Sequence, residues 1–210
     1  MTRLVIARHG NTFEAHEQPR RIGSRTDLPL TATGLEQAKA LARHFAGNGI
    51  RFDRVLSSAL QRTQMTAAAM AGDTPVEAAG FLTEIDHGPD ENQFEADVVD
   101  RLGEEALKLW DEQMIAPKGW EVGAEWRLPA WREFVEDVAE TMPGRTILLV
   151  TSNGAARFGL AAVGLKQVDN RAGLKLRTGS YGVIEVGDGQ FRLIGWDMRP
   201  GETPADVGLF

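Results

Sequence analysis

Short unbroken apolar runs mark the strands of this chain. Residues 52–56 predict one strand, with Phe52, Val55 and Leu56 around two charged residues, while residues 4–7 are wholly aliphatic and residues 146–151 hold four aliphatic residues between two threonines. Runs of this length without polar alternation are typical of strands that are buried on both faces of a parallel sheet. The pattern therefore predicts three parallel strands, of which residues 146–151 form the clearest.

Between these runs the apolar residues recur every three or four positions, which predicts helices. The predicted helical segments are residues 34–45, 58–70 and 155–163. Thr33 with Glu36, and Ser58 with Gln61, have the spacing of a capping box, in which the paired side chains bond free backbone N–H groups of the first turn. We expect these two pairs to begin the first two helices.

The C-terminal part of the chain has the pattern of a β-hairpin. Residues 180–186 and 190–196 are both strand-like, and the Gly187-Asp188-Gly189 stretch between them favours a tight turn. Strands that alternate with helices indicate an α/β fold. We therefore expect a mostly parallel central sheet with helices on both faces and an antiparallel hairpin at its C-terminal end.

Residues 84–140 interrupt the alternation of strands and helices. Residues 84–112 carry eleven acidic and two basic side chains, and four of the five tryptophans follow closely: Trp110, Trp120, Trp126 and Trp131. We expect one domain over residues 1–210, with a helical insertion at about 84–140 that covers the carboxyl ends of the strands. We expect its tryptophans to pack between the insertion and the body rather than to contact a substrate.

Composition and charge narrow the function classes. With 42% hydrophobic residues the chain can bury a full core, and a net charge of −7 argues against nucleic-acid binding. Cysteine is absent, which excludes disulfides, thiol nucleophiles and thiolate metal sites. The sequence shows neither a signal peptide nor a run of about 18 apolar residues, so we expect a cytoplasmic protein without membrane contacts.

Reactive side chains follow three of the predicted strands. They are Arg8-His9-Gly10 after the first, Ser57-Ser58 leading to Arg62 after the second, and Thr151-Ser152-Asn153-Gly154 after the third. Because ligands bind beyond the carboxyl ends of parallel strands, we expect these groups to meet there. Arginine pairs bidentately with phosphate oxygens, and helix N-termini add N–H donors, so the arrangement predicts a phosphate site.

These residues also match the motifs of a known family. The matching elements, in order, are Arg8-His9-Gly10-x-Thr12, Gly23…Asp27-Leu28-Pro29-Leu30-Thr31…Gly34…Gln37-Ala38, Ser57-Ser58…Arg62…Thr66-Ala67, Leu82-Thr83-Glu84…Gly88, and Gly195-Trp196-Asp197. In these elements the chain resembles the histidine phosphatase superfamily, whose members are phosphoglycerate mutase-like. The resemblance covers most of the chain and constrains the insertion least.

The resemblance implies a role for each matching residue. His9 would be the nucleophile that takes the phosphoryl group and becomes a phosphohistidine, while Arg8 and Arg62 would neutralise the phosphoryl oxygens. Glu84, at the family's proton-donor position, would protonate the leaving oxygen and then activate water. The remaining candidates for phosphate or substrate binding are Asn11, Thr12, Arg21, Ser152 and Asn153.

The expected partner is a small phosphorylated metabolite, and the resemblance implies no metal and no cofactor. Arg20, Arg21 and Arg25 form a basic loop after the nucleophile, which either holds a second anionic group of the substrate or is solvated. The oligomeric state stays open between a monomer and a homodimer.

One position departs from the family's pattern. Members usually carry a second histidine after the last buried strand, which donates a hydrogen bond to the phosphoryl group, and Ser152 stands in its place here. Serine donates one hydrogen bond but brings no positive charge. Losing one transition-state donor costs roughly 10²–10³ in rate, so the replacement does not by itself abolish catalysis. His87, three residues after Glu84, is a candidate to compensate.

Three functions are compatible with these residues. The leading hypothesis is a metal-independent phosphatase that acts on a small phosphorylated metabolite through phospho-His9. A phosphoglycerate mutase is the weaker enzymatic alternative, because the arginine-rich segment associated with true mutases is missing after Glu84 and the stretch is acidic here. A catalytically weak or inactive phosphate-binding or regulatory module is the alternative that Ser152 supports.

Overall fold

A six-stranded sheet forms the centre of the protein. The computed structural model describes residues 1–165 and 173–201. The strands are β1 (Thr2–Arg8), β2 (Arg54–Ser57), β3 (Val76–Ala78), β4 (Thr146–Thr151), β5 (Tyr181–Gly187) and β6 (Gln190–Met198). Their order in the sheet is β3-β2-β4-β1-β5-β6, with parallel pairing from β3 to β1 and antiparallel pairing of β5 with both neighbours. The predicted mostly parallel sheet with an antiparallel C-terminal pair is confirmed.

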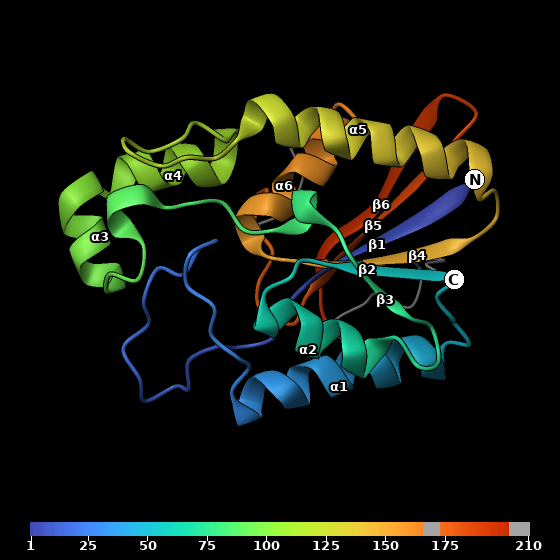
Figure 1. Ribbon diagram of the computed structural model, residues 1–210, viewed down its shortest axis with the longest axis horizontal. Coiled ribbons are helices and arrows are strands. Elements are labelled where there is room, and N and C mark those ends of the chain that lie inside the picture. Colours follow the sequence, from blue (N-terminus) through green and yellow to red (C-terminus); the bar gives the residue numbers. More distant parts are fainter. Residues whose placement is uncertain (166–172, 202–210) are drawn as a thin grey trace.

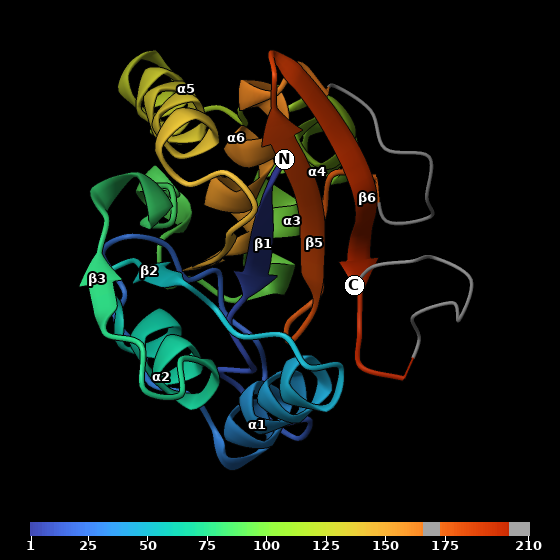
Figure 2. The same ribbon diagram turned by 90° about the vertical axis from the view of Figure 1, so that its right-hand side faces the viewer.

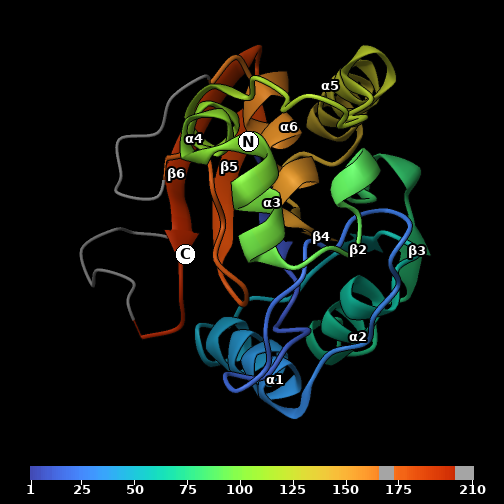
Figure 3. The ribbon, with the colours of Figure 1, turned by 90° about the vertical axis from the view of Figure 1, so that its left-hand side faces the viewer.

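Helices cover both faces of this sheet. The helices are α1 (Ala32–Gly47), α2 (Gln61–Met70), α3 (Glu95–Leu102), α4 (Glu104–Gln113), α5 (Ala124–Thr141) and α6 (Asn153–Ala162), with short 3₁₀ turns η1 (Gly80–Leu82) and η2 (Gly88–Asp90). Figures 1 and 2 show α1 and α2 on one face and α5 and α6 on the other. Figure 3 looks onto the end of the molecule where α3 and α4 lie, beyond the carboxyl ends of the parallel strands.

The aliphatic run of β1 supplies the core on both faces of the sheet. Leu4 and Ile6 belong to the cluster that contains the side chains of α5 and α6, whereas Val5 and Ala7 belong to the cluster under α1 and α2. Successive side chains of a strand point to opposite faces, so an unbroken run is needed where both faces are covered. All four side chains are 0% exposed, and burial of each large one stabilises the fold by about 1.5–3 kcal/mol.

The first two helices begin differently from the predicted capping boxes. Thr31, not Thr33, caps α1: its side-chain oxygen accepts a hydrogen bond from the Gly34 N–H at 3.1 Å. The N–H of Gln61 at the start of α2 donates to Asp27 Oδ1 at 2.7 Å. The predicted Thr33 cap is wrong because α1 begins before Thr33, at Ala32, and the predicted Ser58 cap is wrong because Asp27 supplies the acceptor at the start of α2.

Buried arginines fix the region between residues 84 and 140 to the body of the protein. From α6, Arg157 donates to the Trp110 carbonyl and to Asp111 Oδ1, both at 2.5 Å. From α5, Arg127 donates to the carbonyl of Thr83 at 2.5 Å, one residue before Glu84. The loop that carries Glu84 is therefore held by a side chain from the region that follows it.

The tryptophans of this region pack mainly in the core. Trp110, Trp120 and Trp131 are 2%, 7% and 0% exposed, which confirms the expected packing. Trp126 is 47% exposed, so the expected packing is wrong for this residue. The Arg127 guanidinium lies over the Trp126 ring, 4.5 Å from the ring centroid.

Candidate active site

The end of β1 carries His9 into the protein and fixes its ring. The His9 N–H donates to the carbonyl of Thr151 at 3.1 Å, which continues the β1–β4 pairing by one residue. The ring's Nδ1 lies 2.7 Å from the carbonyl oxygen of Gly10. Because a carbonyl oxygen only accepts hydrogen bonds, Nδ1 carries the proton and Nε2 keeps its lone pair.

Burial keeps this ring in its nucleophilic form. Removal from water is the main reason that the pKa of His9 lies well below 6.5, and the charges of Arg62 and Arg8 lower it further. The hydrogen bond to Gly10 acts in the opposite direction and is outweighed. His9 is therefore neutral at physiological pH, and a neutral imidazole nitrogen is a competent nucleophile.

The loop after His9 packs against the start of α1, backbone to backbone. A Cβ atom on Gly10 would lie 2.2 Å from the carbonyl oxygen of Gly34, and one on Gly34 would lie 2.1 Å from the carbonyl oxygen of Asn11. Both positions therefore require glycine. The Asn11 N–H also donates to Gln37 Oε1 at 2.8 Å, so α1 holds the segment that follows the nucleophile.

Two arginines lie close to His9, and each has a buried Nε donor that makes no hydrogen bond to a described residue. Arg8 donates to the Leu176 carbonyl at 2.6 Å, and Arg62 donates to the carbonyls of Thr26 and Gly23 at 2.8 and 3.0 Å. The Nε atoms of both arginines are buried without a hydrogen-bond partner among the described residues. Burial lowers the pKa of Arg8 from 12.5 to about 10, so the guanidinium is still charged at neutral pH. Unpaired cationic donors of this kind suit an anion.

The carboxylate of Glu84 lies at the N-terminus of α6. It accepts hydrogen bonds from the N–H groups of Gly154 and Ala155 at 3.0 and 3.1 Å, and from its own neighbour Ile85 at 2.8 Å. A Cβ atom on Gly154 would lie 2.3 Å from Glu84 Oε1, so glycine is what allows the carboxylate this close. Helix N-termini favour negative charge, and here the protein's own side chain provides it.

These contacts keep Glu84 ionised. Burial alone would raise the pKa of Glu84, but the His87 ring, the N–H groups of Gly154 and Ile85, and Arg62 lower it below its usual value. In this state the carboxylate is a base, and it donates a proton only after it has taken one up.

Ser152 is the residue predicted to stand in place of the family's second histidine. It precedes α6 and is 1% exposed, and its Oγ has no hydrogen-bond partner within the described ranges. The following residue, Asn153, uses Oδ1 to accept the Leu176 N–H at 2.9 Å. Residues 151–154 at the β4–α6 junction therefore include one buried hydroxyl without a hydrogen-bond partner among the described residues and no cationic side chain.

A cavity of about 640 Å³ opens beside His9 and collects most of the predicted site. Seven of the nine predicted residues line it: Arg8, His9, Asn11, Thr12, Arg21, Glu84 and Asn153. The other two, Arg62 and Ser152, are buried and do not line it. The strand ends thus meet as expected, while the catalytic and binding roles of these residues stay predictions.

The basic loop divides between the cavity and the surface. Arg20 and Arg21 line the cavity, and Arg21 Nη2 donates to Glu95 Oε2 at 2.6 Å while its guanidinium lies over Trp120. Arg25 does not line this cavity and pairs with Asp86 at 2.8 Å.

Some lining residues were not predicted as site residues. Trp110, Lys175 and Thr178 all border the cavity. His87, which was considered only as a candidate to compensate for Ser152, borders it too. Trp110 was assigned to packing alone, although it both packs and lines the cavity. No local pattern marks Lys175 or Thr178, because they reach the cavity only through the long-range arrangement of the chain.

Two further observations concern the described residues only. None of their helices is both long enough and apolar enough to cross a membrane. Within the same ranges, no group of three or more His, Asp or Glu side chains is arranged to hold a metal ion.

Sequence comparison relates the chain to one family. The model of the histidine phosphatase superfamily (branch 1) matches residues 4–199. A 2,3-bisphosphoglycerate-dependent phosphoglycerate mutase of Methylobacterium sp. (strain 4-46) is 34% identical over 119 residues, which are 54% of this chain and 56% of the relative. The mutase of Mesorhizobium japonicum is 27% identical over 183 residues, 84% of this chain and 88% of the relative.

Solved structures agree with this relationship. The alpha-ribazole phosphatase from Shigella flexneri has a TM-score of 0.68 at 25% identity, covering 94% of this chain and 96% of its own. A mycobacterial glucosyl-3-phosphoglycerate phosphatase in complex with VO3 has the same fold, with a TM-score of 0.75 at 23% identity and coverage of 93% and 98%. With a family match over nearly its whole length and these shared folds, the chain belongs to the histidine phosphatase superfamily.

Proposed function

We propose that this protein is a metal-independent phosphatase that hydrolyses a small phosphorylated metabolite through a phosphohistidine on His9. The observation that carries the proposal is the ring of His9, which is neutral, buried and fixed by its Nδ1–Gly10 hydrogen bond with Nε2 free. The unpaired Nε donors of Arg8 and Arg62 support it, because they give a phosphoryl group its anion contacts.

The first chemical step transfers the phosphoryl group to the enzyme. Nε2 of His9 attacks phosphorus, the bond from phosphorus to the ester oxygen breaks, and that oxygen leaves with a proton. Arg8 and Arg62 stabilise the charge on the phosphoryl oxygens, which is the main contribution that a protein makes to phosphoryl transfer. In the second step water attacks phosphorus, the P–N bond breaks, and inorganic phosphate is released.

Glu84 is the proposed proton carrier of both steps. It is ionised in the free protein, but a phosphate dianion beside it disfavours the charged form and raises the pKa of the carboxyl. Glu84 therefore takes up a proton as substrate binds and gives it to the leaving oxygen. The carboxylate regenerated in this way then removes a proton from the attacking water.

The wall of the cavity points to a leaving group with apolar surface, since Phe13, Leu107 and Trp110 contribute to it. The charged residues of the wall are largely paired: Glu95 with Arg21, and Asp111 with Arg157 and Lys175. These charges therefore do not select against a second anionic group. A phosphatase is favoured over a phosphoglycerate mutase because the arginine-rich segment associated with true mutases is missing after Glu84, although the curated relatives reported above are named as mutases.

Hydrolysis of a generic aryl phosphate in the presence of a chelator tests the proposal. Wild-type protein should turn over and form an acid-labile phosphoenzyme, and His9→Ala should lower kcat by at least about 10⁴-fold, the scale on which loss of a nucleophile acts. His16→Ala, which removes an exposed histidine outside the cavity, is the matched control and should keep wild-type activity.

Two outcomes would contradict this function. Turnover that survives His9→Ala would exclude the phosphohistidine route. Tight binding of vanadate with no hydrolysis of any ester tried would favour the inactive phosphate-binding module, with Ser152 as its cause.

A further inference from the structure

His87 is a second histidine of the cavity, outside the motifs that define the family. It lines the same cavity as His9 and Glu84, although only 5% of the residue is exposed. It comes from the loop between η1 and η2, on a different element from Ser152. Two histidines, His9 and His87, therefore line the cavity. His87 comes from a different element than the one on which the family's pattern places its second histidine.

One nitrogen of the His87 ring is sealed inside the protein. Nδ1 is buried without a hydrogen-bond partner among the described residues, and it lies 3.6 Å from Glu91 Oε2. That separation is too long for a hydrogen bond and lies within the range of an ion pair. Since Nδ1 is closed off, Nε2 is the polar atom that the ring can offer to a ligand.

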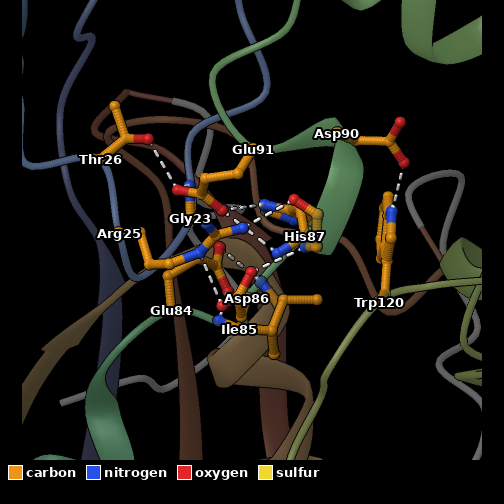
Figure 4. Close-up of polar contacts among 12 residues, drawn as sticks. Gly23, Arg25, Thr26, Glu84, Ile85, Asp86, His87, Asp90, Glu91 and Trp120 are labelled. Carbon is orange, nitrogen blue, oxygen red and sulfur yellow. Dashed lines mark hydrogen bonds and ion pairs between the residues drawn. The ribbon is translucent and has the colours of Figure 1, made fainter.

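Glu91 is a fixed negative charge behind this ring. It accepts hydrogen bonds from the Gly23 N–H at 2.8 Å, from Thr26 Oγ1 at 2.7 Å and from the His87 N–H at 3.2 Å (Figure 4). Burial alone would raise the pKa of Glu91, but contacts with His87, Thr26 and Gly23 lower it to about 2. The carboxylate is thus ionised over the whole range in which phosphatases work.

Packing keeps the ring in place. His87 meets Trp120 edge to face, with 4.5 Å between ring centroids and 78° between ring planes. A Cβ atom on Gly23 would lie 2.7 Å from His87 Nδ1, so the loop at Gly23 closes over that nitrogen. Replacing His87 with another aromatic residue therefore keeps the packing against Trp120 and removes the ring nitrogens.

We propose that His87 is a catalytic residue of this site, which supplies through Nε2–H the charged hydrogen bond to the phosphoryl group that Ser152 lacks. With phosphate bound, both N–H groups of the imidazolium face an anion, Glu91 at Nδ1 and phosphate at Nε2. Charge-assisted hydrogen bonds of this kind are about twice as strong as neutral ones. The inference rests on the proposed function, since it assigns a partner to the phosphoryl group on His9.

His87→Phe is the variant that isolates the chemistry, because it keeps an aromatic ring against Trp120. Its kcat on an aryl phosphate should fall roughly 10²-fold, the typical loss for one transition-state donor, with little change in KM. Ser152→His in the His87→Phe background should recover at least about tenfold, while Ser152→His in wild type should gain much less. Such non-additivity is expected when two residues fill one role.

Binding of vanadate gives a readout that does not depend on turnover. His87→Phe should weaken it by about tenfold or more, the scale of one charge-assisted hydrogen bond. His16→Phe, at an exposed histidine outside the cavity, should leave vanadate binding unchanged.

The outcomes separate this inference from the proposed function. Absence of turnover in wild type would overturn the phosphatase, and vanadate binding would still decide the role of His87. Unchanged vanadate affinity in His87→Phe would overturn the inference whether or not the protein is an enzyme. In an active enzyme, wild-type kcat in His87→Phe would overturn it equally.

Discussion

The two sides of His9 are built in different ways. On the side of β1 and α2, Arg8 and Arg62 bring guanidinium groups whose Nε atoms have no partner among the described residues. On the side of β4 and α6, Ser152 brings a hydroxyl without charge, and Glu84 occupies the helix N-terminus with a carboxylate.

The difference shows where the site can recognise an anion. A free helix N-terminus binds phosphate through its N–H groups, but in this protein the N–H groups of Gly154 and Ala155 are used by Glu84. Under the proposed function, phosphate recognition is therefore assigned to the arginines, and proton transfer is assigned to the β4–α6 side. Changes on the two sides should accordingly produce different kinetic losses.

The largest effect is expected on the arginine side. Arg62→Met removes a guanidinium that is 0% exposed, and kcat/KM should fall by roughly 10³-fold, as for loss of an electrostatic donor in a closed site. Arg21→Met should cost less than about tenfold, because Arg21 is already paired with Glu95. Steady-state kinetics on one aryl phosphate would measure both.

Arg62→Met also leaves the carbonyls of Gly23 and Thr26 without a donor, which costs about 1–3 kcal/mol each in stability. Circular dichroism should first establish that the variant is folded at the assay temperature. Equal losses for a folded Arg62→Met and for Arg21→Met would remove the distinction between buried and peripheral arginines.

An intermediate effect is expected on the α6 side. In Gly154→Ala the new Cβ would lie 2.3 Å from Glu84 Oε1, so the carboxylate has to move away from α6. We expect kcat to fall by roughly 10²-fold, within the range of lost acid–base catalysis, while vanadate binding changes little. Gly47→Ala is the matched control, since a Cβ there has no neighbour within 4 Å and α1 should gain about 0.5–1 kcal/mol. Loss of vanadate binding in Gly154→Ala would show that α6 contributes to anion recognition after all.

The smallest effect concerns stability at low pH. The pKa of Glu91 is about 2 in the folded protein and 4.5 in the unfolded reference, so the Glu91 carboxylate takes up a proton less readily in the folded state. The stability that Glu91 contributes is therefore complete above about pH 4.5 and is lost as the pH falls toward 2. Thermal unfolding of wild type and Glu91→Gln should give a higher Tm for wild type at pH 7 and a shrinking difference toward pH 3. A difference that stays constant over this range would mean that the charge of Glu91 adds nothing.

The strands of the core could be predicted from the sequence, because their signal is local. The aliphatic runs of β1 and β4 are buried on both faces, and the turn of the β5–β6 hairpin has positive φ at Asp188 and Gly189 as expected from Asp-Gly. The three-residue strand β3 was missed, since Val76 is only half buried and its neighbours are exposed. The cap of α2 was wrong because Asp27, which is distant in sequence, binds the start of that helix. The cap of α1 was misplaced by two residues, since Thr31 and not Thr33 accepts the first free N–H.

The candidate site, like the fold, could be predicted from the sequence only where the signal is local. The strand-end pattern predicted that Arg8, His9 and Asn153 share one cavity, because the topology of a parallel sheet places the carboxyl ends of its strands together. Glu84 was predicted from the family resemblance instead. No local sequence signal predicts that Glu84 binds the α6 N-terminus. None predicts the position of His87 between Glu91 and Trp120 either. Both depend on contacts between segments that only the folded chain brings together.

The backbone contact between Gly10 and Gly34 has a consequence for the speed of the reaction. A reactive group that turns freely must lose rotational entropy each time it meets a substrate, and well-oriented groups avoid much of that barrier. With the loop of His9 pressed onto α1, that entropy is lost once, during folding. In the proposed reaction, every encounter with substrate then begins from an imidazole that is already oriented.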